Sequence, residues 1–119
     1  MSLRYFKMKE FACPCCGKNE MDPRFLAILD ETRSRSPVPW VITSGYRCEK
    51  HNAEVGGKPD SAHTKGLAVD IAIGNSYDRM MILRPLFDSY EWRRIGIGKD
   101  FVHIDLDTTK PQNVIWMYS

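Results

Sequence analysis

The sequence predicts an α+β fold, with a largely antiparallel sheet and helices packed on it. Segments with helical patterning begin early in the chain, whereas most strand-like segments come late. The last two strand-like segments are joined by a very short connection, as in an antiparallel hairpin. The 119 residues are fewer than the roughly 150 of an average domain. We therefore expect one domain over residues 1–119, with room for one core and one site.

The first half of the chain predicts a helix, a strand and a second helix. Residues 22–33 open with an aspartate as N-cap and with Pro23 in the first turn, where the missing N–H of proline does no harm. Residues 37–43 form a β-rich run between prolines and a Ser-Gly pair, which predicts a buried strand. Residues 47–55 have helical composition and are followed by two glycines. Glycine is the residue expected where a chain leaves a helix in the left-handed backbone conformation.

The second half predicts most of the sheet. Residues 67–73 are rich in β-branched side chains and predict an interior strand. Residues 77–90 carry apolar side chains at helical spacing, and a proline near their end predicts a kink. Two short strands are expected over residues 94–98 and 101–106. The aromatic C-terminal residues 114–118 are expected to pack against the core.

Composition and charge exclude several classes of protein. Seventeen lysines and arginines against fifteen aspartates and glutamates leave a net charge of +2, far from the basic excess of a nucleic-acid-binding chain. No stretch reaches the about 18 apolar residues of a membrane helix. No apolar region or small-residue cleavage site follows the charged N-terminus, so no signal peptide is expected. We expect a monomer that is synthesised in the cytoplasm and binds neither nucleic acid nor membrane.

The four cysteines leave two interpretations open. Cys13, Cys15 and Cys16 are crowded together, and cysteines this close rarely form disulfides with one another. The favoured interpretation is free thiols in a reducing compartment, with at most one bridge to Cys48. The alternative is a structural zinc site built from two pairs of ligands. These pairs are Cys13 with Cys16 and Cys48 with His51, although the gap between them is wider than in common zinc fingers.

Two histidines and an aspartate have the chemistry of a catalytic zinc site. Zinc held by two imidazoles and one carboxylate keeps a fourth position for a water molecule, whose pKa it lowers to about 7. Asp70 and His103 lie in two predicted strands, and His103 shares a strand face with Asp105 because side chains alternate. His63 lies on a loop that Gly66 allows to turn back toward that face. Spacing alone leaves the alternative that both histidines are ordinary surface or core residues.

Three motifs resemble one peptidase family. Residues 61–70 match S-x-H-x-x-G-x-A-x-D, the signature of the metal-dependent D-alanyl-D-alanine carboxypeptidase family, whose fold is shared with the hedgehog signalling domain. Before this motif, residues 43–52 look like the family's S-G-[YF]-R segment followed by a short helix. After it, residues 101–105 resemble the last ligand strand of the small members, many of them phage lysins or murein-trimming enzymes. The resemblance covers residues 11–105.

The resemblance implies a hedgehog/DD-peptidase-like fold and a set of functional residues. It implies that His63, Asp70 and His103 bind Zn²⁺. It also implies that Arg47 polarises the substrate carbonyl or stabilises the developing oxyanion, a role in which a fixed guanidinium contributes several kcal/mol. The alternative for Arg47 is a surface arginine paired with a nearby glutamate.

At the general base the sequence departs from the family pattern. Larger members have a glutamate three residues before the last histidine, where this chain has Asp100, whose side chain is one methylene shorter. Asp105 is the rival, about 6–7 Å beyond His103 on the same strand face, where it could act as base or orient a ligand histidine. A third alternative is that no side chain serves as base and zinc hydroxide acts alone.

Three residues beside the motifs have competing interpretations. Ser61 is expected to hydrogen-bond to the substrate backbone, or else to be a turn serine. Tyr46, next to Arg47, is a candidate for substrate binding or a packed core residue. His51 lines the cleft, joins the cysteines or is solvated on its short helix.

We therefore expect a zinc peptidase that hydrolyses an amide bond in the peptide stem or cross-link of bacterial peptidoglycan, as a carboxypeptidase or an endolysin-like endopeptidase. A phage or prophage enzyme of this type would reach the cell wall without a signal peptide, through a separate pore or on the virion. The alternative from another class is a zinc-containing binding module of the same fold that has lost turnover. A cysteine-zinc nucleic-acid module is disfavoured by the near-neutral charge.

Overall fold

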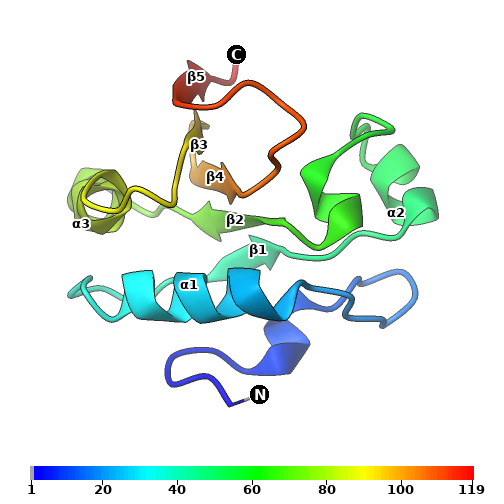
Figure 1. The fold of residues 1–119 in the computed structure, drawn as a ribbon, viewed down its shortest axis with the longest axis horizontal. Coiled ribbons are helices and arrows are strands. Elements are labelled where there is room, and N and C mark those ends of the chain that lie inside the picture. Colours follow the sequence, from blue (N-terminus) through cyan, green and yellow to red (C-terminus); the bar gives the residue numbers. More distant parts are fainter. Residues whose placement is uncertain (1) are drawn as a thin grey trace.

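A five-stranded mixed sheet organises residues 2–119, the part of the chain that the computed structural model describes (Figure 1). The strands are β1 (Ile42–Ser44), β2 (Ala68–Ala72), β3 (Arg94–Ile97), β4 (Phe101–Asp105) and β5 (Val114–Met117). Their order is β1-β2-β4-β3-β5, and only the β3–β5 pair is parallel. The predicted α+β fold with a largely antiparallel sheet is confirmed.

Five helical segments accompany the sheet. They are the 3-10 helices η1 (Met8–Phe11) and η2 (Ala62–Lys65) and the α-helices α1 (Pro23–Arg33), α2 (Glu49–Glu54) and α3 (Ser76–Phe87). Helix α1 begins as predicted, because the Asp22 carboxylate accepts the backbone N–H groups of Arg24 and Phe25. Within residues 2–119, no helix has both the length and the apolar character needed to cross a membrane.

The core lies on one face of the sheet. In Figure 1, α1 runs alongside β1, α3 lies at the left end of the molecule, and α2 and η2 lie at the right. Alternate residues of β2 and β4 are buried together with apolar residues of α1 and α3. These residues are Val69, Ile71, Val102, Ile104, Phe25, Leu26, Leu29, Ile82 and Leu86. The opposite face of β2 and β4 is therefore free to carry polar residues.

Several predicted elements differ in extent from the observed ones; the helix predicted over residues 47–55, for example, covers only Glu49–Glu54. The strand predicted over residues 37–43 is too long, because β1 covers only Ile42–Ser44. Its first half contains two prolines, which cannot donate a backbone hydrogen bond to a neighbouring strand. The helix predicted over residues 77–90 ends at Phe87, and Pro85 lies in its last turn.

The C-terminal segment differs more from the prediction. It does not pack as a block against the core but forms β5, at the edge of the sheet next to β3. Ile115 and Met117 are exposed, whereas the intervening Trp116 is partly buried. Because side chains alternate along the strand, Trp116 faces the side of the sheet opposite to those two residues.

Candidate metal centre

The pairing of β2 with β4 brings two of the predicted ligands together. In this antiparallel pair, Asp70 lies directly opposite His103. Both side chains point to the sheet face that is not covered by the core, since Val69 and Val102, their neighbours in sequence, are fully buried on the other face. Residues that are 33 positions apart in the chain thus become cross-strand neighbours.

The third predicted ligand, His63, is held beside them by η2. The Ser61 hydroxyl caps this helix by accepting the His63 backbone N–H at 3.2 Å. Gly66 ends it with φ +71°, and its carbonyl accepts the Asp22 N–H at 2.9 Å. The chain therefore turns back sharply, as predicted for this loop, and the His63 ring is almost fully buried beside Asp70.

We expect Gly66→Ala to destabilise the protein by about 3 kcal/mol or more. The positive φ costs an L-residue about 1–2 kcal/mol, and a Cβ here would lie 2.1 Å from the Glu20 carbonyl oxygen, so the backbone must shift. Gly56→Ala is the matched control, because Gly56 has φ +75° but nothing within 4 Å of the added Cβ. Urea unfolding should show only about 1–2 kcal/mol for the control. Equal losses in the two variants would contradict the close contact at Gly66.

The three candidate ligand atoms lie within 4.8 Å of one another, and two of their separations are close to those of a tetrahedral zinc site. The Nε2 atom of His63 lies 3.3 Å from Oδ1 of Asp70, and Nδ1 of His103 lies 2.9 Å from the same oxygen. Zinc bonds of about 2.0–2.1 Å at tetrahedral angles place neighbouring ligand atoms about 3.3 Å apart. Two imidazoles and one carboxylate therefore fit a divalent transition metal such as zinc, in composition and in spacing.

In each candidate ligand histidine, the ring nitrogen that faces away from Asp70 already has a hydrogen-bond partner. The Nδ1 atom of His63 lies 2.8 Å from the Gly45 carbonyl oxygen, and Nε2 of His103 lies 2.8 Å from Oδ2 of Asp105. A carbonyl or carboxylate oxygen can only accept, so these nitrogens carry the hydrogens. Outer-shell bonds of this kind fix the tautomer and the ring orientation of metal-binding histidines. They leave the other nitrogen of each ring facing Asp70.

The electrostatics of the cluster favour a cation. Burial alone would raise the pKa of Asp70, but hydrogen bonds from His103 and His63 hold it well below its usual range. Burial alone would lower the pKa of His103, but its hydrogen bonds to Asp105 and Asp70 raise it above its ordinary value. The two carboxylates thus stabilise positive charge on and around the His103 ring.

Arg47 lies at the edge of this cluster. Its Nε donates to the Ser44 hydroxyl at 3.0 Å and its NH1 to the Asn52 side-chain oxygen at 3.2 Å. Its NH2 lies 3.5 Å from Oδ2 of Asp70, the carboxylate oxygen that faces away from the histidines. Arg47 is therefore not a solvated surface arginine paired with a glutamate. It is mostly buried, and its guanidinium is fixed next to the candidate ligands.

The two candidate bases lie in different environments. Asp105 is fully buried. Its Oδ2 accepts a hydrogen bond from Nε2 of His103, and its Oδ1 accepts one from Nε of Arg94 at 2.8 Å. Asp100 is exposed in the turn between β3 and β4, and its side chain does not contact the three ligands. The structure thus brings Asp105, and not Asp100, into the cluster. Asp105 contacts the far side of the His103 ring, which is the position of an orienting carboxylate.

The remaining candidates are divided between the site and its surroundings. Ser61 lies in the wall of the cavity next to His63. Tyr46 is buried in the core outside that wall, and a hydrogen bond with Glu20 raises its pKa to about 12. His51 is half-buried on α2 and does not line the cavity.

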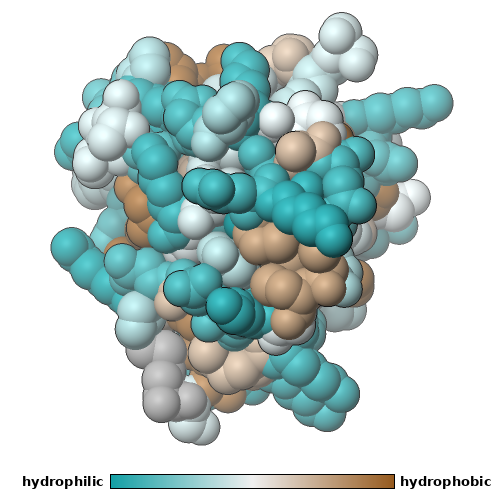
Figure 2. All heavy atoms as spheres, turned by 90° about the vertical axis from the view of Figure 1, so that its right-hand side faces the viewer, coloured by the Kyte–Doolittle hydropathy of each residue, from teal (hydrophilic) through white to brown (hydrophobic). Residues whose placement is uncertain are grey.

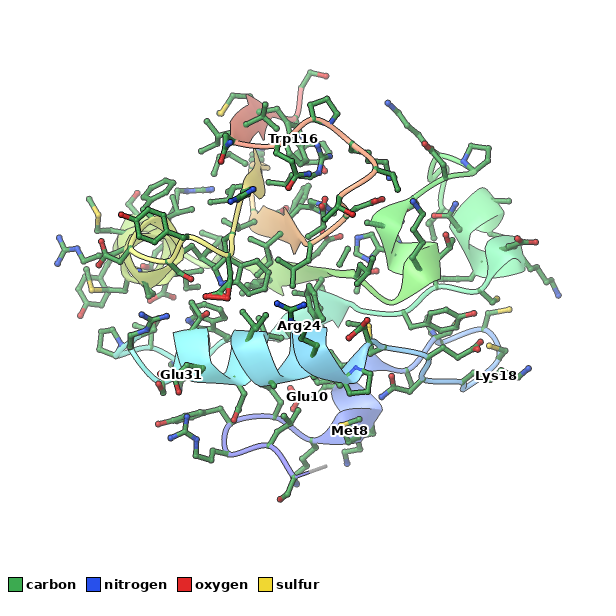
Figure 3. The ribbon with its side chains drawn as sticks, in the orientation of Figure 1. Met8, Glu10, Lys18, Arg24, Glu31 and Trp116 are labelled. Atoms are coloured by element: carbon green, nitrogen blue, oxygen red, sulfur yellow. The ribbon has the colours of Figure 1, made fainter. Side chains whose placement is uncertain are left out.

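The cluster opens into a cavity of about 560 Å³. This volume is in the range of small-molecule and peptide sites. Several of its walls come from residues that the sequence analysis did not single out. These are Arg94, Phe101, Lys110, Trp116 and Tyr118. Figure 3 shows Trp116 above β4, where its ring centroid lies 5.6 Å from that of His103 and its face meets the Arg94 guanidinium.

One of these residues could have been found from the sequence. The short turn between the last two strands fixes their register, which places Arg94 directly opposite Asp105. A basic residue opposite an acidic one is a cross-strand ion pair. Trp116 and Tyr118 offered no such signal, because β5 reaches the site by parallel pairing with β3 after a long connection.

Comparison with known proteins agrees with this geometry. The sequence profile described as Peptidase M15 matches residues 4–105, which include α1 to α3, four of the five strands and all three candidate ligands. A comparison with curated proteins finds no match for the chain. The peptidases of this family depend on a metal ion, as the grouping of His63, Asp70 and His103 also indicates. The chain belongs to the Peptidase M15 family of metallopeptidases.

Proposed function

We propose that the protein is a zinc peptidase that hydrolyses an amide bond in the peptide stem or cross-link of bacterial peptidoglycan. The observation that carries this proposal is the convergence of His63, Asp70 and His103 at the base of an open cavity. Structural zinc sites are closed by four protein ligands, whereas catalytic sites keep one position open. Three protein ligands beside a cavity support the catalytic class.

Zinc would be held by Nε2 of His63, a carboxylate oxygen of Asp70 and Nδ1 of His103. When bound, the ion would supply a Lewis acid for the substrate carbonyl and would lower the pKa of a water molecule. Asp105 acts as a positioning residue, because it holds the Nε2 hydrogen of His103 and so directs Nδ1 toward the metal position. Arg94 keeps Asp105 in place through the 2.8 Å bond to its Oδ1.

Arg47 is the group that would stabilise negative charge on the carbonyl oxygen. Its three bonded partners leave the guanidinium in one orientation at the cavity wall. A charged donor that is already fixed in a partly buried site stabilises an oxyanion without reorganising during the reaction. This arrangement supports catalysis over an inactive binding module, which needs no such donor.

The cavity walls suit a short peptide with free carboxylates. Lys58 contributes an ammonium group to the cavity lining, Ser61 a hydroxyl, and Trp116 and Tyr118 aromatic rings, whereas the Lys110 ammonium is already paired with Asp107. Stem peptides of peptidoglycan combine carboxylates with small apolar side chains. The Lys58 ammonium would pair with a substrate carboxylate, and Trp116 and Tyr118 would contact the apolar parts.

Digestion of purified peptidoglycan tests the proposal directly. The zinc-loaded protein is incubated with peptidoglycan, and the soluble products are identified by mass spectrometry, which also names the bond that is cut. We expect products that disappear when a chelator removes the metal. If the fully zinc-loaded protein binds peptidoglycan but cuts no stem-peptide bond, the inactive binding module becomes the better account.

We expect Arg47→Ala to retain the metal at the His63 site but to lose about a hundredfold in kcat on peptidoglycan. This is the usual effect of removing one oxyanion-stabilising donor. Arg24→Ala is the matched control, because Arg24 is exposed on α1 (Figure 3) and is not among the residues that line the cavity. Metal analysis and the rate of product release are measured on the same preparations. Full activity of Arg47→Ala at full metal occupancy would contradict the assigned role.

A further inference from the structure

A second cluster of metal-binding side chains lies apart from the site described above. The sulfur atoms of Cys13, Cys16 and Cys48 all lie within 4.8 Å of one another. Cys13 and Cys48, which are 35 residues apart in the chain, have their sulfurs 3.6 Å apart. The sequence favoured separate thiols with at most one bridge. The structure instead brings three of the four cysteines to one point.

The local backbone accounts for the convergence of Cys13 and Cys16. The chain folds back between Cys13 and Lys18, because the Cys13 N–H donates to the Lys18 carbonyl at 2.8 Å and the Gly17 N–H to the Cys13 carbonyl at 2.7 Å. Gly17 has φ +74°, which only glycine adopts at little cost. This closed loop orients two thiols of a C-x-x-C segment toward the same point.

The third sulfur comes from the start of α2. The Cys48 side chain caps this helix, since its sulfur accepts the His51 backbone N–H at 3.4 Å. The Cys48 N–H in turn donates to the Cys13 sulfur at 3.5 Å. Backbone N–H groups that point at sulfur favour the thiolate, which is the form that binds metals.

We propose that Cys13, Cys16 and Cys48 bind a structural zinc ion. Zinc–sulfur bonds of about 2.3 Å at tetrahedral angles place neighbouring sulfurs about 3.8 Å apart, close to the 3.6 Å between Cys13 and Cys48. Thiolates select zinc over harder divalent ions. Cys15, which precedes Cys16, and His51, one helical turn after Cys48, are the candidates for the fourth ligand.

Three converging sulfurs argue for a metal rather than a disulfide. A bridge between Cys13 and Cys48 would leave Cys16 without a partner in the same cluster. The Cys13 sulfur is almost fully buried, whereas Cys16 is exposed, so that an ion can enter from the solvent side. The cluster lies on the α2 side of the molecule, which faces the viewer in Figure 2 and is mostly hydrophilic with a small apolar patch.

The ion would link the N-terminal segment, which contains Cys13 and Cys16, to the segment that contains Arg47 and Cys48. Cys48 directly follows Arg47, and one backbone hydrogen bond, from the Tyr46 N–H to the Phe11 carbonyl at 2.9 Å, already joins the two segments. A metal bound at this point stabilises the folded state, because the unfolded chain has no preformed site.

Metal stoichiometry tests this proposal independently of peptidase activity. Protein purified under reducing conditions with zinc should contain about two equivalents per chain, and Cys16→Ser or Cys48→Ser about one. The two variants should also melt about 10 °C lower than the wild type. His63→Ala is the matched control, because it should lose the other equivalent and keep the cysteine-bound one. Cobalt in place of zinc should give a thiolate-to-metal charge-transfer band that only the cysteine variants lose.

Three results would each overturn the proposal. The first is a wild-type protein with a single equivalent that His63→Ala removes entirely. The second is free alkylation of Cys13, Cys16 and Cys48 in the folded, zinc-loaded protein. The third is a Cys13–Cys48 disulfide that persists after purification with a thiol reductant. Cys16 is exposed, so a folding defect in Cys16→Ser is not expected to obscure the result. Failure of the peptidase assay would leave these measurements unaffected.

Discussion

Replacing His103 by alanine is expected to remove about one equivalent of metal per chain and to abolish peptidase activity. The substitution deletes the ligand atom that lies 2.9 Å from Asp70, and the two remaining ligands leave an ion half solvated. The loss of affinity should exceed the about 10–100-fold that removal of an outer-shell residue causes. Elemental analysis after dialysis and product release from peptidoglycan measure the two effects.

The variant His63→Ala should behave in the same way, because its Nε2 atom is the other imidazole ligand on Asp70. Both histidines are buried, so the free energy of unfolding of the metal-free proteins must be compared to separate loss of metal from loss of fold. Undiminished metal content in both histidine variants would show that the ion is held elsewhere.

The second large effect is expected for Asp105→Asn. One carboxylate oxygen now accepts from His103, and the other accepts from Arg94 and from the Asp107 backbone N–H. An amide supplies only one acceptor atom, so one of these donors must face an NH₂ group. We expect metal affinity to fall by about 10–100-fold and activity at limiting zinc to fall at least as far.

Asp100→Asn is the comparison that separates a positioning role from proton transfer. Asp100 is exposed and outside the cavity wall, so this variant should keep its metal affinity and lose less than about tenfold in rate. A base deletion would instead leave the metal in place and cost about 10²–10⁴ in rate. Such a loss in Asp100→Asn at full metal occupancy would assign the base to Asp100 and contradict the outcome expected here.

The grouping of the candidate ligands was predictable because it depends on local rules. Side-chain alternation places Asp70 on one face of its strand and His103 on one face of its own, and a motif with a turn-forming glycine connects His63 to the first strand. The distinction between Asp100 and Asp105 was not predictable. It depends on the exposure of Asp100 in its turn and on the orientation of the His103 ring toward Asp105, and sequence spacing determines neither.

Contacts between distant segments account for the rest of what the sequence missed. The parallel pairing of β5 with β3, which brings Trp116 to the cavity, follows a long connection with no hairpin signal. The approach of Cys48 to Cys13 depends on how the N-terminal loop packs against the start of α2. The gap between Cys16 and Cys48 is wider than in common zinc motifs, so the favoured interpretation from the sequence was free thiols.

The cross-strand register of β2 and β4 also limits where the sequence can gain or lose residues during evolution without losing the site. Deleting one residue within β2 would exchange its two faces, so that Val69 or Ile71 would replace Asp70 opposite His103 and a carboxylate would enter the core. The connection that contains α3 can gain or lose residues without changing that pairing. Searches for distant homologues should therefore use two rigid patterns, one for each strand, joined by a gap of free length.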